Sequence, residues 1–586
     1  MTYALVLAAQ ADAGLYGQLA ALGVRGVAAA ERTAPGLLTV AAAARAAGER
    51  VLICVGDDAV PEETLARLLE TNGTAAFTGM QARTARTVRR RPGQQPPRTS
   101  AAGDGALVVD TPDLDALAAA AESLAATQAA PTAVGTLVGE LARHGVAVRV
   151  LDAGPDGDGA VAQLIIDPAA RDMARWAAWR TLTPAALYGF SLGLGLLSAV
   201  WFSELAIRSK AFAIVALFSS FTTSRAGSLL AATGGEARIR PAVVWLGVAS
   251  SLLTEFAVYA ALAVSSGLVS QNVAGGLGYP AGLNGVFGSA LQNAQVASWG
   301  GAGQVGVWRL AVAALLVLGV RRMAEVCYEC TARVPTNIFP RSAKRILQQI
   351  ITFPTGERFV VIALTAVLFG PRVTFLVLLA WGVVAAGYVL AAQMARSAKA
   401  TRADCELRAY RDDGVVSRWL GGLARGLLPP LPPLVVSLLV TCVLAALGLA
   451  NLPGILVLTP AVAMLLAGLG ARHPHHGRLD WLVPALLLTG EGVFLAALGF
   501  SYNVRPPLIF ALLAAVVMRH ADFAYRARFV MGLRADRFGL GWDGRMLLAG
   551  LAAAVGQVPL AYAVVSGYLW LLFCWDFLSG WQKAAA

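Results

Sequence analysis

The sequence predicts an N-terminal α/β domain followed by all-α polytopic membrane bundles. Only 14% of the 586 residues are charged and 57% are hydrophobic, whereas soluble domains are about 25% charged. A single globular core rarely grows beyond about 250–300 residues, so this much apolar sequence needs lipid around it. Apolar runs of about 20 residues, the length that crosses a bilayer, start near residue 181.

The first 170 residues alternate two kinds of segment. "YALVLAA" and "RVLICVGDD" predict buried strands, while "GLYGQLAALGV" and "PEETLARLLETNG" predict helices. Strands that alternate with helices indicate a doubly wound α/β domain. The basic, proline-rich segment 83–98 interrupts this rhythm and is predicted to be a solvated loop.

Two sets of apolar segments predict the membrane spans. The first set lies near 185–207, 210–230, 241–267, 304–321, 357–370 and 372–394. The second set lies near 428–449, 453–470, 481–500, 506–519, 546–563 and 564–580. We therefore expect three regions: a soluble domain at 1–170, a six-span domain at 171–400, and a C-terminal membrane domain of unknown function at 401–586.

Loop charges predict the orientation, because cytoplasmic loops are enriched in Lys and Arg. The connection 267–308 contains no charged residue and is expected outside. Basic residues follow the fourth and sixth spans, which places those loops and the N-terminal domain in the cytoplasm. The expected location is the cell membrane, and the net charge of +12 is assigned to these loops rather than to nucleic-acid binding.

Three stretches carry a resemblance to a known family: "WAAWRTLTPAALYGFSLGLGLLSAVWF", "VVWLGVASSLLTEFAVYAALA" and "ITFPTGERFVVIALTAVLFGPRVTFLVLLAWGVVAAGYVLA". Together, over about 176–397, they resemble CDP-alcohol phosphotransferases, which are six-span membrane enzymes. The preceding domain resembles sugar- or inositol-phosphate nucleotidyltransferases, as in bifunctional enzymes that make CDP-inositol and then transfer it. Through "YRDDG", "LDWLVPALL", "HADFAYRAR" and "LGWDGRML", the tail resembles an uncharacterised actinobacterial membrane domain.

The resemblance also predicts that the transferase chemistry is lost. The family motif is D-x-x-D-G-x-x-A-R-x8-G-x3-D-x3-D, whose aspartates hold divalent metal and activate the acceptor alcohol. Here Thr223 and Ala226 stand at the first two aspartates, Gly227 is kept, and Gly247 and Ser251 stand at the last two. We therefore expect no catalytic residues and no metal, with Mg²⁺ or Mn²⁺ needed only if the transferase is active.

A remaining pocket, if the family site persists, is predicted at the cytoplasmic mouth of the first bundle, lined by Arg225, Glu236, Arg238 and Glu255. The two glutamates are the only acids between residues 206 and 324. The expected ligand of this pocket is a CDP-linked molecule or a lipid head group. The other expected partners are the lipid bilayer and, in a possible homodimer, a second copy of the chain. The rival hypothesis is an active enzyme that moves a phospho-alcohol from CDP onto an inositol- or glycerol-type acceptor through these atypical ligands.

The N-terminal domain shows a parallel departure from its family pattern. Nucleotidyltransferases of this type begin with L-A-A-G-x-G-x-R, whose amides cradle a triphosphate, whereas this chain has "LAAQADAG". Asp57 and Asp58 follow a predicted strand and are candidate metal ligands; a turn with helix-capping acids is the alternative. Lysine is absent from residues 1–209, which excludes a catalytic lysine there.

The second bundle has its own ionisable cluster, formed by Glu491, Arg519, Asp522, Tyr525 and Arg526. Ionisable groups inside spans are costly and often functional, which makes a transporter or flippase a further alternative. The competing interpretation is a juxtamembrane ion-pair network on anionic lipid.

Two other groups of residues suit metal or redox chemistry by type. The histidines of "RHPHHGR", at 473, 475 and 476, lack an evident fourth zinc ligand, so a solvated turn is favoured. Cys327 and Cys330 form a lone CxxC, which is interpreted as structural.

Overall fold

The computed structural model describes seventeen parts of the chain. They are residues 2–7, 26–30, 50–55, 75–78, 105–109, 113–126, 141, 149–151, 159–233, 241–274, 304–331, 351–399, 411–425, 428–450, 452–473, 477–529 and 540–585. The chain divides into two compact units. The N-terminal unit comprises Met1–Asp156, Arg171–Thr181 and Leu229–Ile239, and the membrane unit comprises Gly157–Ala170, Leu182–Ser228 and Arg240–Ala586.

The N-terminal unit contains a mixed six-stranded sheet in the order β2-β1-β3-β5-β4-β6. The strands are β1 (Thr2–Leu7), β2 (Gly26–Ala30), β3 (Arg50–Val55), β4 (Ala75–Thr78), β5 (Gly105–Val109) and β6 (Arg149–Leu151). β5 runs antiparallel to β3 and β4, while the other pairs are parallel. β1 and β3 lie where "YALVLAA" and "RVLICVGDD" predict strands. Helix α5 (Leu114–Ala126) follows β5, whereas Asp57, Asp58 and segment 83–98 lie outside the described residues.

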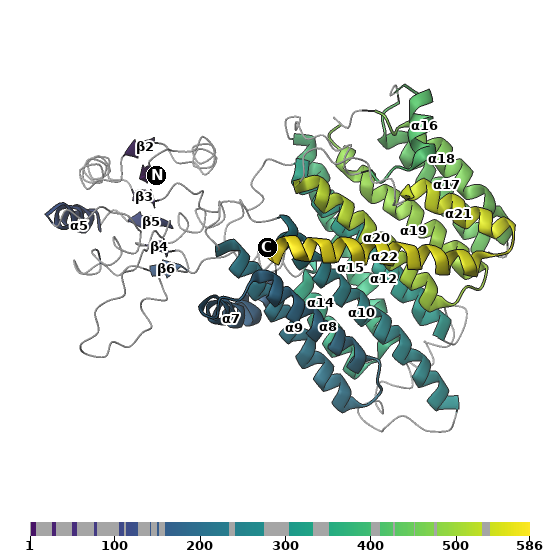
Figure 1. Cartoon of the computed structure of the whole chain (residues 1–586), viewed down its shortest axis with the longest axis horizontal. Coiled ribbons are helices and arrows are strands. Elements are labelled where there is room, and N and C mark those ends of the chain that lie inside the picture. Colours follow the sequence, from purple (N-terminus) through teal and green to yellow (C-terminus); the bar gives the residue numbers. More distant parts are fainter. Residues whose placement is uncertain are drawn as a thin grey trace. The chain divides into compact units, whose positions relative to one another are not determined.

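Six long or medium helices form the first part of the membrane unit (Figure 1). They are α8 (Pro184–Phe202), α9 (Ile207–Thr233), α10 (Pro241–Ala274), α12 (Gln304–Thr331), α14 (Thr355–Leu368) and α15 (Pro371–Lys399). The "LTP" turn explains where α8 begins: Pro184 occupies the first turn, and Thr183 Oγ1 accepts a hydrogen bond from the Ala186 amide at 3.2 Å. Each of the first six predicted spans overlaps one helix, but α12 and α14 are not among the described helices that are long and apolar enough to cross a membrane.

The second part of the membrane unit has more, and shorter, elements. They are α16 (Val415–Leu423), α17 (Leu431–Leu449), η4 (Pro453–Leu458), α18 (Thr459–Leu469), η5 (Asp480–Leu482), α19 (Val483–Ser501), α20 (Pro506–Phe529), α21 (Gly541–Ala554) and α22 (Val558–Ala585). The predicted spans 546–563 and 564–580 have the wrong boundary. The chain breaks at Gly556, whose φ is +72°, and Pro559 lies in the first turn of α22.

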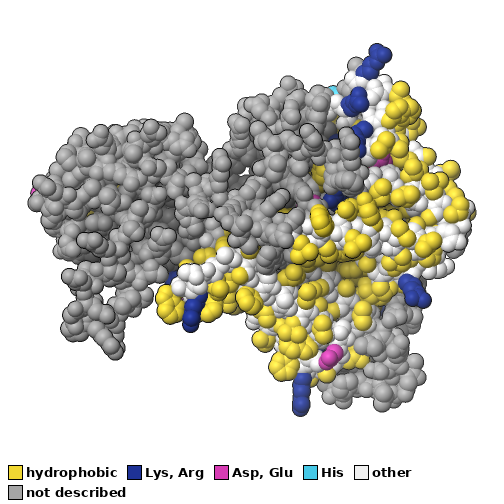
Figure 2. Space-filling view, viewed as in Figure 1, with side chains coloured by type: hydrophobic (Ala, Val, Ile, Leu, Met, Phe, Trp, Pro, Cys, Tyr) yellow, Lys and Arg dark blue, Asp and Glu magenta, His cyan; other side chains and the backbone are white. Residues whose placement is uncertain are grey.

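Eight of the described helices are long and apolar enough to cross a membrane. They are α8, α9, α10, α15, α17, α19, α20 and α22. α14 has 14 residues, or about 21 Å, which is shorter than the hydrocarbon layer of about 30 Å. Hydrophobic side chains cover much of the visible flank of the helices (Figure 2). The chain is therefore a multi-pass integral membrane protein.

One hydrophobic core runs through the helices on both sides of residue 400. α12 packs on α20, and α10 packs on α20 and α22. The Trp245 and Phe573 rings meet edge to face at 6.3 Å between centroids, and the Trp308 and Phe510 rings do so at 5.7 Å. The predicted six-span and C-terminal regions thus share one compact unit.

Candidate functional site

Tyr188 of α8 fills the space beside two of the motif positions. A side-chain carbon added at Gly247 would lie 2.7 Å from Tyr188 Cζ, and one at Gly227 would lie 3.0 Å from Tyr188 Cε1. The tyrosine is 3% exposed, and its hydroxyl lies 3.3 Å from Ser228 Oγ. An aspartate at position 247 therefore requires the aromatic ring to move.

The other motif positions are occupied by small side chains. Thr223 Oγ1 donates to the Ser219 carbonyl of its own helix at 2.7 Å. Ala226 is fully buried, and Ser251 is half-buried on α10. None of these three side chains carries a charge that could offset a metal ion or a pyrophosphate.

Two of the four candidate pocket residues are held in ion pairs. Arg225 Nε donates to Asp167 Oδ1 at 2.9 Å, where Asp167 begins helix α7 (Asp167–Trp179). Glu255 Oε1 accepts from Arg358 Nη2 at 2.6 Å, and both side chains are buried. Buried charges need such partners, so both residues are compensated within the protein. Glu236 and Arg238 lie outside the described residues.

In the described part of the chain, no group of three or more His, Cys, Asp or Glu residues is placed so that it could hold a metal ion. Cys327 is buried. The Cys330 side chain, His475 and His476 lie outside the described residues, and His473 is half-buried.

In the second bundle, Glu491 belongs to a buried cluster with Asp412, His520 and Arg545, called the tetrad below. Arg545 Nε and Nη2 donate to the two Glu491 carboxylate oxygens at 2.6 and 2.9 Å, and Arg545 Nη1 donates to Asp412 Oδ2 at 2.7 Å. His520 Nε2 lies 2.9 Å from Glu491 Oε2. The tetrad thus joins α19, α20, α21 and the segment before α16.

The tetrad carries two carboxylates and one guanidinium. Its net charge is −1 with a neutral His520 and zero with a protonated one. All four residues are at most 4% exposed, so an unbalanced charge here lacks solvation by water. His520 Nε2 also lies 3.3 Å from Arg545 Nη2, so the imidazole touches both the carboxylate of Glu491 and the guanidinium of Arg545.

Segment 411–417 and residues 540–545 form a second connection, called the clasp below. Asp543 Oδ1 accepts from the Gly414 amide at 2.6 Å, and Asp543 Oδ2 accepts from the Ser417 amide at 2.8 Å. Asp543 therefore caps the N-terminus of α16 from a distant part of the sequence. Burial raises the pKa of the Asp543 carboxyl, and the two amide hydrogen bonds oppose this shift.

The clasp has a second set of contacts around Asp413. Its carboxylate accepts from Arg411 Nε at 2.7 Å and from Trp542 Nε1 at 2.9 Å. Gly541 has a φ of +67°, and a side-chain carbon there would lie 2.2 Å from the Gly414 nitrogen. Only glycine permits this close backbone approach.

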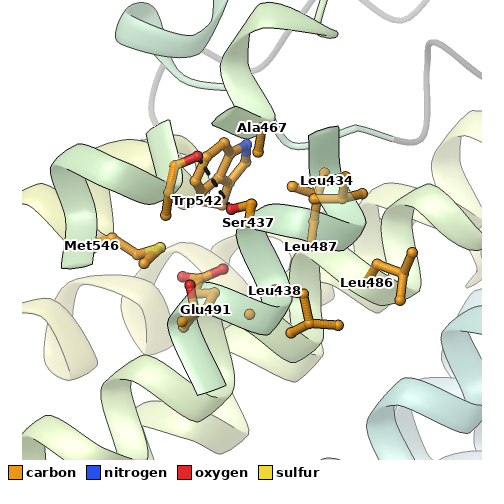
Figure 3. A pocket seen from close by; sticks show the side chains of 12 residues that line it. Leu434, Ser437, Leu438, Ala467, Leu486, Leu487, Glu491, Trp542 and Met546 are labelled. Carbon is orange, nitrogen blue, oxygen red and sulfur yellow. Dashed lines mark hydrogen bonds between the residues drawn. The ribbon is translucent and has the colours of Figure 1, made fainter. Parts of the chain in front are cut away.

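A narrow cleft with a cavity volume of only about 10 Å³, close to the room that one water molecule needs, lies beside the tetrad. In Figure 3, Glu491, Trp542 and Met546 stand on one side of it, four leucines stand on the other, and Ser437 lies between them. Its lining residues are Leu434, Ser437, Leu438, Thr441, Ala463, Ala467, Leu486, Leu487, Gly490, Glu491, Trp542 and Met546. The cleft is largely apolar, and Glu491 is its one ionisable wall residue.

The described residues of the predicted C-terminal cluster fall into two groups: Glu491 belongs to the tetrad, and Arg519 lies beside Asp522. Arg519 and Asp522 are both buried and lie 3.7 Å apart on α20. The side chains of Tyr525 and Arg526 lie outside the described residues. Sequence reasoning missed Asp412, His520 and Arg545 as partners of Glu491, although "YRDDG", "HADFAYRAR" and "LGWDGRML" contain them.

Comparison with known families matches residues 398–586 to a family of unknown function, DUF5941. This range contains the whole tetrad, the clasp and the cleft. A comparison with curated proteins finds no match.

Proposed function

We propose that this membrane protein descends from CDP-alcohol phosphotransferases, has lost their catalytic activity, and acts in or alongside phospholipid or polar-head-group synthesis. The observation that carries this proposal is the Tyr188 ring, which lies against Gly227 and Gly247. Metal-dependent phosphoryl transfer needs carboxylates that bring divalent ions to the pyrophosphate. At Gly247 this chain presents an aromatic ring in the space that an aspartate would need.

The ion pairs of the same region support the proposal. Glu255 is the described acid that follows the motif on α10, and it already accepts a hydrogen bond from Arg358 at 2.6 Å. A carboxylate compensated by a buried guanidinium is a poor ligand for a second cation, because the two cations repel each other. An active enzyme with atypical ligands would have to break this pair.

The proposal extends to the N-terminal domain, which we place in the cytoplasm at the cell membrane. It is a nucleotidyltransferase-like domain whose phosphate-binding turn is replaced by "LAAQADAG", beginning at the end of β1. Its role and that of the first bundle are then to bind a CDP-linked molecule or a lipid head group, or to assist an active relative.

A CMP-release assay tests the loss of activity. The purified full chain is incubated with CDP-inositol, CDP-diacylglycerol or CDP-glycerol, with an inositol- or glycerol-type acceptor alcohol and with Mg²⁺ or Mn²⁺, and no CMP release above the protein-free blank is expected. Metal-dependent release that Glu255→Gln abolishes and Glu204→Gln preserves would contradict the proposal. Glu204 is a suitable control because its contact is an exposed one with Ser209.

The tetrad favours transport as a second candidate function. Buried ionisable groups within spans often mark ion or proton pathways, and the tetrad brings Glu491, His520 and Arg545 into contact inside the bundle. Transport predicts a proton flux in liposomes under an imposed pH gradient that His520→Gln and Glu491→Gln both reduce. Equal fluxes from the wild-type protein, from both folded variants and from protein-free liposomes would remove this candidate.

A further inference from the structure

Helix α16 displays an apolar stripe that no described part of the chain covers. Val415, Trp419 and Leu423 are 78%, 63% and 62% exposed. Their spacing of four residues places all three side chains on one face of the helix. Ser417 and Gly421, on the other side, are buried.

The opposite face of α16 is firmly anchored, so the direction of the stripe is determined by packing. α16 packs on α18 and α21, and the Asp543 carboxylate of the clasp caps its first turn. A side-chain carbon at Gly421 would lie 3.0 Å from Ala471 Cβ, which shows how closely the chain after α18 approaches. A helix of nine residues is not stable alone in water, so these contacts hold it.

The exposed charges around the stripe are basic. Arg425, Arg472 and Arg478 are exposed, and Arg418 is half-buried. The Arg472 guanidinium lies against α16, since a side-chain carbon at Gly422 would be 3.3 Å from Arg472 Cζ. Figure 2 shows basic side chains projecting at the end of the bundle where Figure 1 labels α16.

The described acids of the same segments are buried or half-buried and accept hydrogen bonds inside the protein. Asp412 and Asp413 accept from Arg545 and Trp542. Asp480 accepts from the Gly477 amide at 2.8 Å, and Asp543 caps α16. The surface beside the stripe is therefore both apolar and positively charged.

We propose that α16 and its flanking arginines form a binding site for anionic phospholipid head groups. An apolar stripe with a tryptophan, bordered by basic residues, is typical of helices that lie in the membrane interface. The neighbouring helix α17 supports lipid rather than a protein as the occupant. Its exposed residues Val436, Leu439 and Val443 form a lipid-facing surface close in sequence to the stripe.

The site has a consequence for the core of the bundle. Asp543 caps α16, and Asp412 in the segment before α16 binds Arg545 of the tetrad. A ligand that binds only the folded form of α16 also stabilises those segments whose folding is coupled to that of α16. Anionic lipid is therefore expected to stabilise the clasp and the tetrad as well as α16.

The first test locates the stripe relative to lipid. The full chain and its Trp419→Phe variant are reconstituted in liposomes that contain lipids brominated near the head group. The fluorescence difference between the two proteins isolates Trp419, and we expect bromine to quench most of it. No quenching, or a Trp419→Cys variant that cross-links efficiently to a second copy, would overturn the lipid assignment.

The second test measures selectivity for negative charge. Phosphatidylglycerol or phosphatidylcholine is titrated into detergent-solubilised protein, and the melting temperature is recorded. The R425Q/R472Q/R478Q variant should bind phosphatidylglycerol more weakly, by roughly fivefold for each arginine removed. The control R208Q/R309Q/R505Q removes three exposed arginines elsewhere and should respond as the wild type does. Equal responses of both variants, or a wild-type response that is the same for both lipids, would overturn the proposal.

Discussion

The two parts of the membrane unit bury their charges in different ways. In the first bundle, Glu255 and Arg358 form a pair at 2.6 Å, and Asp167 and Arg225 form a separate pair at 2.9 Å. In the second bundle, Arg545 bridges two carboxylates at 2.6 and 2.7 Å, and the same segments also form the clasp. Each of these ion pairs connects two segments of the chain, whereas the tetrad connects four.

This difference indicates which buried charged residues can be replaced by apolar residues without loss of stability. A buried pair can be replaced by two apolar side chains at little cost, because both charges leave together. In the tetrad, removing Arg545 together with one carboxylate leaves the other carboxylate buried without its guanidinium. The C-terminal part is thus built to keep one arrangement of its segments.

The largest effect is expected from Arg545→Gln. It leaves Glu491 and Asp412 buried without their guanidinium, which should lower the free energy of unfolding by about 4 kcal/mol. Denaturant unfolding in mixed micelles measures the change, with exposed Arg505→Gln as a control near zero. The double variant Arg545→Met/Glu491→Leu should stay unstable, because Asp412 remains; full recovery would show that the tetrad is only a pair.

Glu255→Ala should cost less, about 3 kcal/mol, because Arg358 loses its carboxylate but keeps its hydrogen bonds to the Phe353 carbonyl at 3.1 Å and to Thr355 Oγ1 at 2.9 Å. Here the double variant Glu255→Leu/Arg358→Met should recover most of the loss, in contrast to the tetrad. The same unfolding assay provides the comparison. A double variant as unstable as Glu255→Ala would mean that the pair belongs to a larger network.

Gly247→Asp tests the space beside Tyr188. The new side chain meets the ring, so the free energy of unfolding should fall by about 2 kcal/mol. Adding Tyr188→Ala should relieve the clash. Gly247→Ala compared with Gly387→Ala isolates the steric part from the cost of a charge within a span, because a side-chain carbon at Gly387 meets nothing within 4 Å. A stable Gly247→Asp protein with no need for Tyr188→Ala would show that the ring moves aside easily.

The smallest effect is expected from Asp543→Asn. The amide still accepts one hydrogen bond but loses the negative charge at the N-terminus of α16, which should cost about 1 kcal/mol. Hydrogen exchange of the Gly414 and Ser417 amides should speed up, while exchange in α10 should stay unchanged. Unaltered hydrogen exchange at both amides would show that the hydrogen bonds to Asp543 do not stabilise the N-terminus of α16.

Much of the fold could be predicted because membrane helices are local features. A run of about 20 apolar residues finds its helix from its own backbone hydrogen bonds, so the first six spans coincide with helices. The boundary of the last two helices was also visible in the sequence, as Gly556 and Pro559. It was missed because hydropathy continues unbroken through both.

The candidate site was far less accessible. Glu491 stood out as an acid inside an apolar run, but its partner Arg545 lies 54 positions away and Asp412 lies further still. No periodicity connects such residues. Arg519 and Asp522, two members of the predicted cluster, do lie 3.7 Å apart on α20, because residues three apart share a helix face.

By itself, the sequence determined that the chain enters the membrane many times, since burial of apolar side chains in lipid depends on local composition. It also determined which positions lack carboxylates, because residue identity at 223, 226, 247 and 251 needs no coordinates. Only the tertiary structure decided that Tyr188 occupies the space at Gly247 and that Arg545 joins Glu491 to Asp412. Those contacts unite residues far apart in the chain, and the packing of whole helices brings them together.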